Sequence, residues 1–266
     1  MSQFYSKKKF GQNFLNDYKV LSKIINAANL NSFDNVVEIG PGKGFLTKAI
    51  LDKVDKLVAI EIDSDLIEIL SSKFKNYNNF KLINADARDI ELNFFKEYKM
   101  LANLPYYAAL PIMRRFLFAQ NKPSVMIIML QKEVASSMVA TPGSHSLLSI
   151  TTQLFCKPSI ISYVSSSSFK PKPKVNSALV KLTPYKKALI DIVDENDFFN
   201  FLKKSFSSPR KQLVNSIGNG LKIAKKDSEH ILNKSNILYT RRAQTLTIDE
   251  WSLLYEQWCL LRDKGI

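Results

Sequence analysis

The chain has 266 residues, of which 45% are hydrophobic and 23% charged. This length accommodates one α/β domain of ordinary size and a smaller one, and no apolar run approaches the roughly 18 residues of a membrane-spanning helix. Two cysteines and two histidines, far apart, argue against a disulfide scaffold, a metal cluster or histidine-based catalysis. The formal net charge of +14 favours nucleic acid as partner, although a generally lysine-rich composition would also produce it.

The N-terminal residues lack the apolar core of a secretory signal, so we expect a cytoplasmic protein with reduced thiols. The run Lys7-Lys8-Lys9 would ordinarily be a solvated tail. The next six residues, Phe10 to Leu15, mix apolar and amide side chains, which favours an ordered basic lid over a ligand. Asp17 is placed to cap a helix whose apolar stripe lies within Val20 to Ile25.

A short apolar run, Val36 to Ile39, is typical of a strand buried on both faces. It ends in glycines at alternate positions, Gly40, Gly42 and Gly44, and a helical pattern starts at Phe45. Glycine allows unusual backbone angles and a close approach of a ligand to the main chain. The same glycines could also serve only to fold the strand back onto the helix.

Two further strands are predicted over Lys56 to Asp63 and Phe80 to Asp86, each with a carboxylate near its end. Glu61 lies about twenty residues after the glycines, where nucleotide-binding folds place a carboxylate on the ribose hydroxyls. Asp86 is suited to accept the amino group of an adenine ring. The alternatives are a solvated carboxylate for Glu61 and a helix or turn cap for Asp86.

More elements follow in the same alternation. We predict strands over Tyr98 to Asn103 and Ser124 to Leu130, with a helix over Pro111 to Phe118 between them. Strands that alternate with helices give an α/β fold, a doubly wound parallel sheet whose ligands lie at the carboxyl ends of its strands. Helical patterns then extend through Leu154, and two final strands cover Ser159 to Val164 and Ala178 to Leu182, so a first domain is expected over residues 1–185.

Between the last two strands lies a serine run followed by proline-spaced lysines. Lys172 and Lys174 are suited to contact phosphate, and the prolines favour an extended segment. Phe169 could stack on a splayed base, or it could pin the loop to the core.

The remainder, residues 186–266, reads as a small helical domain that contacts RNA. A helix is predicted from Ser208-Pro209 to Gly218, and a capping box opens another at Thr247 and Glu250. The pair Arg210-Lys211 is a candidate RNA contact, as is Arg241-Arg242, although exposed helices often have such pairs without a binding role.

Asn103-Leu104-Pro105-Tyr106 follows a strand end on the same side as the glycines and the two carboxylates. The tetrapeptide resembles the (D/N)-P-P-Y signature of methyltransferases that act on exocyclic amines. Such an amine on adenine is a poor nucleophile because its lone pair is delocalised. The Asn103 amide oxygen and the Leu104 carbonyl can accept both amine hydrogens and direct the lone pair at a methyl donor. Tyr106 would stack on an extruded base. The alternative is an ordinary proline kink after a strand.

The glycine spacing differs from the dinucleotide pattern G-x-G-x-x-G and resembles the E-x-G-x-G-x-G loop of S-adenosylmethionine-dependent methyltransferases. The glycine loop and the tetrapeptide occur in one order with four further motifs, which start at Lys8, Gln131, Phe169 and Arg210. Because of this order, nearly the whole chain resembles the ribosomal RNA adenine dimethyltransferase family, and most closely its bacterial small-subunit branch.

That resemblance implies a Rossmann-like fold and S-adenosylmethionine as cofactor. It implies dimethylation at N6 of two adjacent adenosines near the 3′ end of small-subunit rRNA, with the 30S particle as partner, during ribosome biogenesis. It further implies no metal, and a monomer is expected. Catalysis would involve Asn103, Leu104, Pro105 and Tyr106, and Phe169 would help to hold the target base. The cofactor pocket would be lined by Asn13, Leu15, Gly40, Gly42, Glu61, Asp86 and Asn103.

One position departs from the family pattern N-L-P-Y-N, since Tyr107 occupies its last place. Three alternatives stay open. The closest is the branch that methylates large-subunit rRNA and confers macrolide resistance. A second is a non-catalytic RNA-binding or assembly factor on the same fold. A nicotinamide dehydrogenase is the third, disfavoured by the glycine spacing.

Overall fold

The computed structural model describes residues 11–192 and 194–263, which divide into two compact units. The first extends to Ala135 and includes Lys157–Pro184, and the second comprises Ser136–Cys156 and the chain from Tyr185 onward. The sequence prediction assigned residues 136–156 to the first domain, whereas in the structure this segment groups with the helices that follow residue 185. The predicted basic run at Lys7–Lys9 lies outside the described residues.

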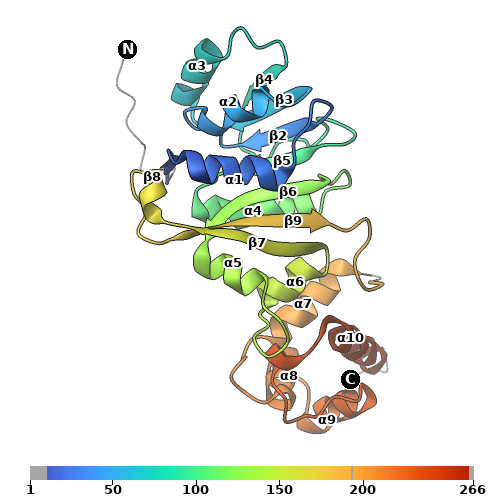
Figure 1. The fold of residues 1–266 in the computed structure, drawn as a ribbon. Coiled ribbons are helices and arrows are strands. Elements are labelled where there is room, and N and C mark those ends of the chain that lie inside the picture. Colours follow the sequence, from blue (N-terminus) through green and yellow to red (C-terminus); the bar gives the residue numbers. More distant parts are fainter. Residues whose placement is uncertain (1–10, 193, 264–266) are drawn as a thin grey trace. The chain divides into compact units, whose positions relative to one another are not determined.

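A seven-stranded sheet forms the centre of the first unit (Figure 1). Its spatial order is β4-β3-β2-β5-β6-β9-β7, so the chain leaves β2 in one direction toward β4 and returns to place β5 on the other side of β2. Such a reversal creates a crevice at the carboxyl ends of the two central strands. The strands are β2 (Asn35–Ile39), β3 (Lys56–Glu61), β4 (Phe80–Asn84), β5 (Lys99–Ala102), β6 (Val125–Gln131), β7 (Cys156–Val164) and β9 (Ser177–Pro184).

Strands β2 to β6 pair in parallel, as the sequence predicted. Strand β9 is antiparallel to β6, with Met126 opposite Leu182 and Gln131 opposite Ser177. The prediction of a wholly parallel sheet is therefore wrong at this strand. A buried apolar run looks the same in either direction, and its direction depends on how the preceding connection returns the chain to the sheet.

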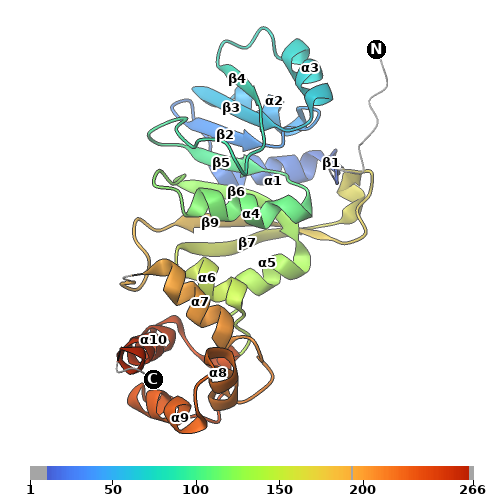
Figure 2. The same cartoon turned by 180° about the vertical axis from the view of Figure 1, so that it is seen from behind.

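Helices cover both faces of this sheet. Helix α1 (Tyr18–Ala28) lies in front in Figure 1, and α4 (Tyr106–Leu117) lies in front after the half-turn in Figure 2. The sequence predicted that α4 begins at Pro111, but this proline lies inside the helix. The other helices of this part of the chain are α2 (Phe45–Leu51), α3 (Ser64–Lys73) and α5 (Lys132–Met138).

The α1 face of the sheet contains one continuous apolar core. Ile24 of α1 and Ile50 of α2 pack in the same buried cluster as Leu57, Leu101 and Ile127 from three strands. Asp17 accepts hydrogen bonds from the backbone N–H groups of Lys19 at 2.8 Å and Val20 at 3.4 Å, which confirms the predicted cap of α1. The predicted stripe within Val20 to Ile25 is buried.

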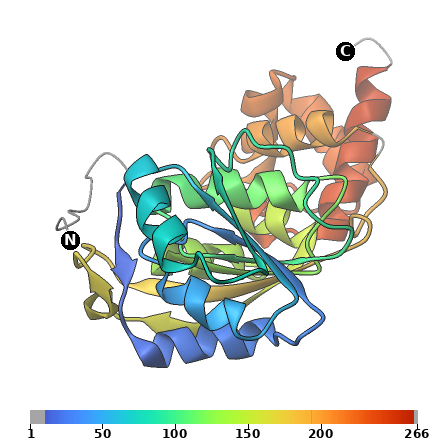
Figure 3. The ribbon, with the colours of Figure 1, turned by 90° about the horizontal axis from the view of Figure 1, so that it is seen from above.

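A separate two-stranded sheet joins segments that are far apart in the sequence. Strand β1 (Phe14–Leu15) pairs antiparallel with β8 (Phe169–Lys170), and the two lie side by side in Figure 3. The side-chain hydroxyl of Ser168, in the short 3-10 helix η2 (Ser166–Ser168), donates to Asp17 at 2.7 Å. The N-terminal segment is therefore fixed to the loop that precedes β9.

The second unit is helical around an aromatic core. Trp251 is fully buried, and its ring lies 6.1 Å from Phe201 and 5.2 Å from Phe206. Hydrogen bonds in both directions between Thr247 and Glu250 confirm the predicted capping box. The helices of the second unit are α6 (Leu147–Gln153), α7 (Glu195–Ser205), α8 (Leu213–Leu221), α9 (Lys225–Lys234), the 3-10 helix η3 (Ala243–Thr245) and α10 (Ile248–Arg262).

The structure differs from two sequence predictions for the second unit. The helix predicted to begin at Ser208-Pro209 begins instead at Leu213, and it ends at Leu221 with Lys222 in the left-handed region. Arg241, considered as an RNA contact, forms an ion pair with Glu250, so it helps to fix the start of α10. No helix within residues 11–192 and 194–263 is both long and apolar enough to cross a bilayer.

Helices α7 and α8 approach most closely at Gly220. A Cβ at this position would lie 2.0 Å from the Lys204 carbonyl oxygen, so Gly220→Ala must push the two helices apart. We expect it to lower the free energy of unfolding by about 2 to 3 kcal/mol in urea denaturation. The matched control is Asn219→Ala, an exposed neighbour on the same helix, expected to change stability by less than about 0.5 kcal/mol. Equal effects would contradict the close-approach argument.

Candidate functional site

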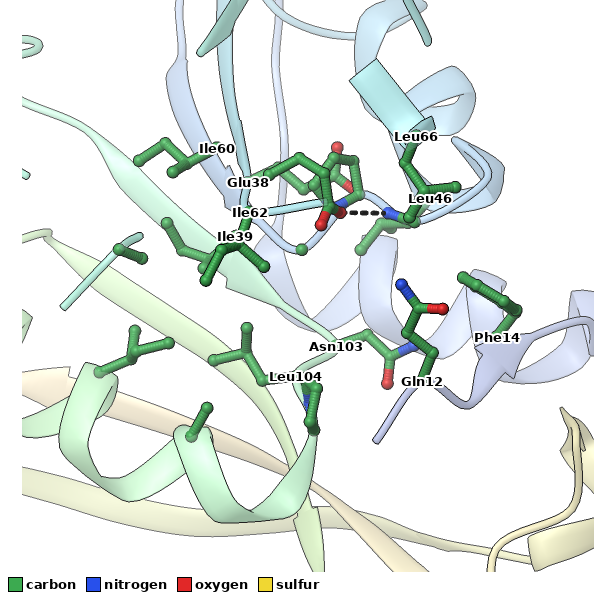
Figure 4. Close-up of a pocket in the computed structure, with 18 of the residues that line it drawn as sticks. Gln12, Phe14, Glu38, Ile39, Leu46, Ile60, Ile62, Leu66, Asn103 and Leu104 are labelled. Atoms are coloured by element: carbon green, nitrogen blue, oxygen red, sulfur yellow. Dashed lines mark hydrogen bonds between the residues drawn. The ribbon is translucent and has the colours of Figure 1, made fainter. Parts of the chain in front are cut away.

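A pocket opens at the carboxyl ends of β2, β3, β4 and β5, around the reversal in strand order (Figure 4). Its walls are partly apolar, with Ile39, Ile62, Leu66, Leu104 and Ile112 among the lining residues. All seven residues predicted for the cofactor pocket line it. They are Asn13, Leu15, Gly40, Gly42, Glu61, Asp86 and Asn103.

The glycine loop forms one wall in a backbone conformation that requires glycine. Gly42 has φ +57°, and a Cβ there would lie 2.9 Å from the Phe14 ring. Phe14 thus packs directly on the loop, and the Lys43 ammonium lies 5.1 Å from the centre of the same ring. A side chain at position 42 would displace Phe14 and, with it, the N-terminal segment.

Glu61 ties this loop to the end of β3. Its carboxylate accepts the backbone N–H of Gly42 at 3.2 Å and that of Asp63 at 3.0 Å. The side chain is nearly buried, and burial raises the pKa of Glu61 in spite of these hydrogen bonds. A carboxylate offers about four acceptor positions, so it can accept ligand hydroxyl groups as well.

A second buried acid, Glu38, lies in the pocket wall. Burial raises the pKa of its carboxyl to about 8, and its Oε2 atom has no hydrogen-bond partner among the described residues. An unpaired buried acceptor is costly and favours a donor from a bound ligand. The sequence analysis quoted Glu38 only as part of the glycine motif. Its position at the end of a buried strand was the signal that could have identified it.

The N-terminal segment closes one side of the pocket. Gln12 donates from Nε2 to the Asp63 carboxylate at 2.8 Å, and Asp63 in turn caps α3. Gln12 also lines the pocket, as does Phe14 (Figure 4). Sequence reasoning expected a lid here but did not assign a role to Gln12 or Asp63, because this contact joins positions 51 residues apart.

Asp86 is held by its own neighbour, Arg88. The Asp86 carboxylate accepts the Arg88 backbone N–H at 2.9 Å, its Nε at 3.0 Å and its Nη2 at 2.5 Å. Hydrogen bonding from Arg88 lowers the pKa of Asp86, which keeps it ionised. The turn-cap role left open in the sequence analysis is therefore present, in a residue that also lines the pocket.

Four catalytic residues were predicted in the segment after β5, and three of them line the pocket. Asn103, Leu104 and Pro105 line the pocket. Tyr106 is half-buried, and its hydroxyl forms a 2.7 Å hydrogen bond with the Ser177 hydroxyl of β9. The side chain that lines the pocket next to Pro105 is Tyr107, which is 57% exposed.

The predicted substrate-binding residues are more dispersed. Phe169 is 95% buried within the apolar core, paired with Leu15, so the structure places it in the position of a loop anchor. Lys172 and Lys174 are exposed on the loop that follows it. Arg210 and Lys211 are exposed in the second unit.

The fold and the pocket define a class of protein, the Rossmann-like methyltransferases. Within that class, a family model described as ribosomal RNA adenine dimethylase matches residues 3–253, and the chain belongs to this family.

Curated relatives agree with that assignment. The chain is 39% identical over 255 residues to "Ribosomal RNA small subunit methyltransferase A" of Dehalococcoides mccartyi, covering 94% of this chain and 87% of the relative. It is 40% identical over 258 residues to the protein of the same name from Clostridium botulinum, covering 95% and 94%.

Solved structures show the same architecture. A dimethyladenosine transferase from Plasmodium falciparum superposes with a TM-score of 0.78 at 28% identity, covering 93% of this chain and 97% of that one. The 23S rRNA methyltransferase ErmE superposes with a TM-score of 0.74 at 24% identity, covering 92% and 99%, which supports the fold.

We predict that Gly42→Ala weakens binding of S-adenosylhomocysteine by at least tenfold in calorimetry, because the new Cβ displaces Phe14 from the loop. Gly143→Ala is the matched control. Gly143 also has a positive φ, +105°, but its Cβ would meet no atom within 4 Å, so only the backbone strain is shared. Similar losses of affinity in the two variants would contradict a specific role for the Gly42–Phe14 contact.

The raised pKa of the buried Glu38 carboxyl should make the stability of the protein depend on pH. Its folded pKa of about 8 exceeds the ordinary value of 4.5, so the folded protein holds a proton that the unfolded chain releases. The free energy of unfolding should therefore decrease from about pH 5 to pH 8, by up to about 1.4 kcal/mol per pH unit from this group. Glu38→Gln should remove this slope.

Urea denaturation at several pH values measures the effect. The exposed Glu68→Gln is the control and should keep the wild-type slope. A Glu38→Gln protein whose stability still falls with pH as steeply as the wild type would show that Glu38 is not the group responsible.

Proposed function

We propose that this protein uses S-adenosylmethionine to dimethylate N6 of two adjacent adenosines near the 3′ end of small-subunit rRNA. Membership of the ribosomal RNA adenine dimethylase family supports the reaction. Relatives near 40% identity named small subunit methyltransferase support the choice of rRNA. We further propose the assembling 30S particle as the physiological substrate.

One observation supports the reaction most directly. Asn103 and three carboxyl groups, those of Glu38, Glu61 and Asp86, reach one pocket from the ends of four adjacent strands. A site rich in acceptors between apolar walls suits a ligand with ribose hydroxyls, an ammonium group and an adenine ring.

The residues present fit this cofactor. The Glu38 carboxyl would hydrogen-bond a polar group of the cofactor, and the free acceptor positions of Glu61 would receive donors. The apolar Ile62 and Leu66 would flank the adenine ring. Gly40 permits the close approach of Leu104, since a Cβ would lie 3.3 Å from its Cδ2 atom. Bound S-adenosylmethionine supplies an electrophilic methyl group on a sulfonium centre.

Asn103 and Leu104 would hold the amine of the target adenosine. Their amide and carbonyl oxygens accept its two hydrogens, so the nitrogen becomes pyramidal and its lone pair is directed at the methyl carbon. With the cofactor bound, Asn103 and Leu104 would orient this lone pair for transfer of the methyl group, which would leave the cofactor as the neutral thioether. The methylated nitrogen is then acidic and loses its proton to water, so no strong general base is needed.

We assign base stacking to Tyr106. Its ring orientation is fixed by the hydrogen bond to Ser177, a residue at the start of β9. Ser177 is fully buried, so this contact fixes the Tyr106 hydroxyl to the start of β9 and supports a defined ring position in the segment that follows Asn103. An extruded base needs such a face, because leaving the stack costs stacking energy.

Exposed cations would contact the RNA backbone. Lys172 and Lys174 lie on the loop before β9, and Arg210 with Lys211 lies in the second unit. The net charge of +14 supports an electrostatic contribution to binding.

The test is to incubate the purified protein with tritiated S-adenosylmethionine and unmethylated 30S particles, digest the rRNA and identify the labelled nucleoside. We expect N6,N6-dimethyladenosine. Asn103→Ala should lower the rate about 100-fold or more, because the amine loses an acceptor that acts in the transition state. Asn103→Asp retains an acceptor and should lose less.

Free 50S particles serve as the alternative substrate. Label in 50S particles alone would contradict the proposed target and favour a large-subunit enzyme. Cofactor binding without any label would leave an RNA-binding protein on a methyltransferase fold.

A further inference from the structure

Arg88 donates to the Asp86 carboxylate, the acceptor that we propose for the amino group of the cofactor adenine. Asp86 Oδ1 receives the Arg88 backbone N–H and Nε at 2.9 and 3.0 Å, and Oδ2 receives Nε and Nη2 at 3.0 and 2.5 Å. These bonds use the roughly four acceptor positions of a carboxylate. An amino group from a ligand can bind Asp86 only if the guanidinium gives up at least one of them.

The guanidinium is able to leave. The Arg88 side chain is 47% exposed, and the Asp86 side chain is 21% exposed, so water can solvate both groups after separation. The backbone N–H bond to Oδ1 belongs to the turn and can persist. A half-exposed ion pair of this kind contributes little to stability, so a ligand donor can compete with it.

A second partner for Arg88 is expected at the rim of the same pocket. Tyr107 and Arg88 both line the pocket, and Tyr107 is 57% exposed. A cation and an exposed aromatic ring that line one pocket are the combination that binds single-stranded nucleic acid, with the cation on phosphate and the ring on a base.

We propose that Arg88 exchanges partners during the reaction cycle: it is bound to Asp86 before the cofactor arrives, and the adenine amino group releases it to bind an RNA phosphate. This inference rests on the proposed function, since it assumes that Asp86 accepts the adenine amine. It makes Arg88 a positioning residue that favours RNA binding after cofactor binding.

The first test measures cofactor affinity. Arg88→Met keeps an unbranched aliphatic stem but removes every side-chain donor, so only the backbone N–H of residue 88 remains bonded to Asp86. We expect calorimetry to give about two- to fivefold tighter binding of S-adenosylhomocysteine, a cofactor form without the sulfonium charge. S-inosylhomocysteine has a carbonyl in place of the amine and should show no such gain. Unchanged or weaker binding of S-adenosylhomocysteine to Arg88→Met overturns the exchange.

The second test measures the salt dependence of RNA binding, using a 12-nucleotide single strand with two adjacent adenosines. One lost phosphate contact reduces the slope of log K against log salt by about 0.7. Arg88→Met should show that reduction with S-adenosylhomocysteine present and none without it. The same slope as the wild type under both conditions overturns the proposal.

A matched control is Lys56→Met. Lys56 is 64% exposed and lies 3.9 Å from Asp55, but it is at the amino end of β3, opposite the pocket. Its substitution should leave cofactor affinity unchanged, and its effect on the salt slope should not depend on the cofactor. If the wild type failed to bind S-adenosylhomocysteine, the proposed function itself would be contradicted. If the wild type binds it and only the Arg88→Met effects are missing, the partner exchange alone is contradicted.

Discussion

The hydrogen bond from the Gly42 N–H to the Glu61 carboxylate is the contact on which the site depends. It joins the loop after β2 to the end of β3 and holds the loop open in a conformation that only glycine adopts easily. Phe14 then packs on the bare backbone of Gly42. Strand ends, glycine loop and N-terminal segment are thereby held around one pocket.

Burial of acids is the second organising feature. Glu38 and Glu61 are both nearly inaccessible to solvent, and burial raises the pKa of each. Their desolvation weakens the folded state and at the same time provides acceptors that a ligand can satisfy. Stability and binding are therefore in opposition at these two positions, as is common in functional sites.

The pairing of β1 with β8 connects the two sides of the proposed reaction. Leu15 lines the pocket, while its partner Phe169 is anchored in the core immediately before the loop that contains Lys172 and Lys174. A change in the N-terminal segment on cofactor binding would reach the loop of Lys172 and Lys174, for which we propose RNA contact, through the main-chain hydrogen bonds of β1 and β8. This geometry gives Phe169 a structural reason to be aromatic and apolar apart from any contact with a base.

Much of this was determined by the sequence alone. Local signals sufficed for the strand–glycine–helix unit, the acids at strand ends and the caps at Asp17 and Thr247, because each depends on neighbouring residues. They also indicated the segment after β5, of which Asn103, Leu104 and Pro105 line the pocket, whereas Tyr106 does not. The family assignment followed from the order of these motifs and was confirmed by the family match.

Tertiary structure decided the rest. The antiparallel β9, the Gln12–Asp63 contact and the Tyr106–Ser177 contact join positions far apart in the chain, and no local pattern specifies which distant residues meet. The start of α8 at Leu213 shows the same limit, since Ser208-Pro209 is a good local helix start that the structure uses as a turn. Sequence reveals what a segment can form on its own, and long-range packing selects among those possibilities.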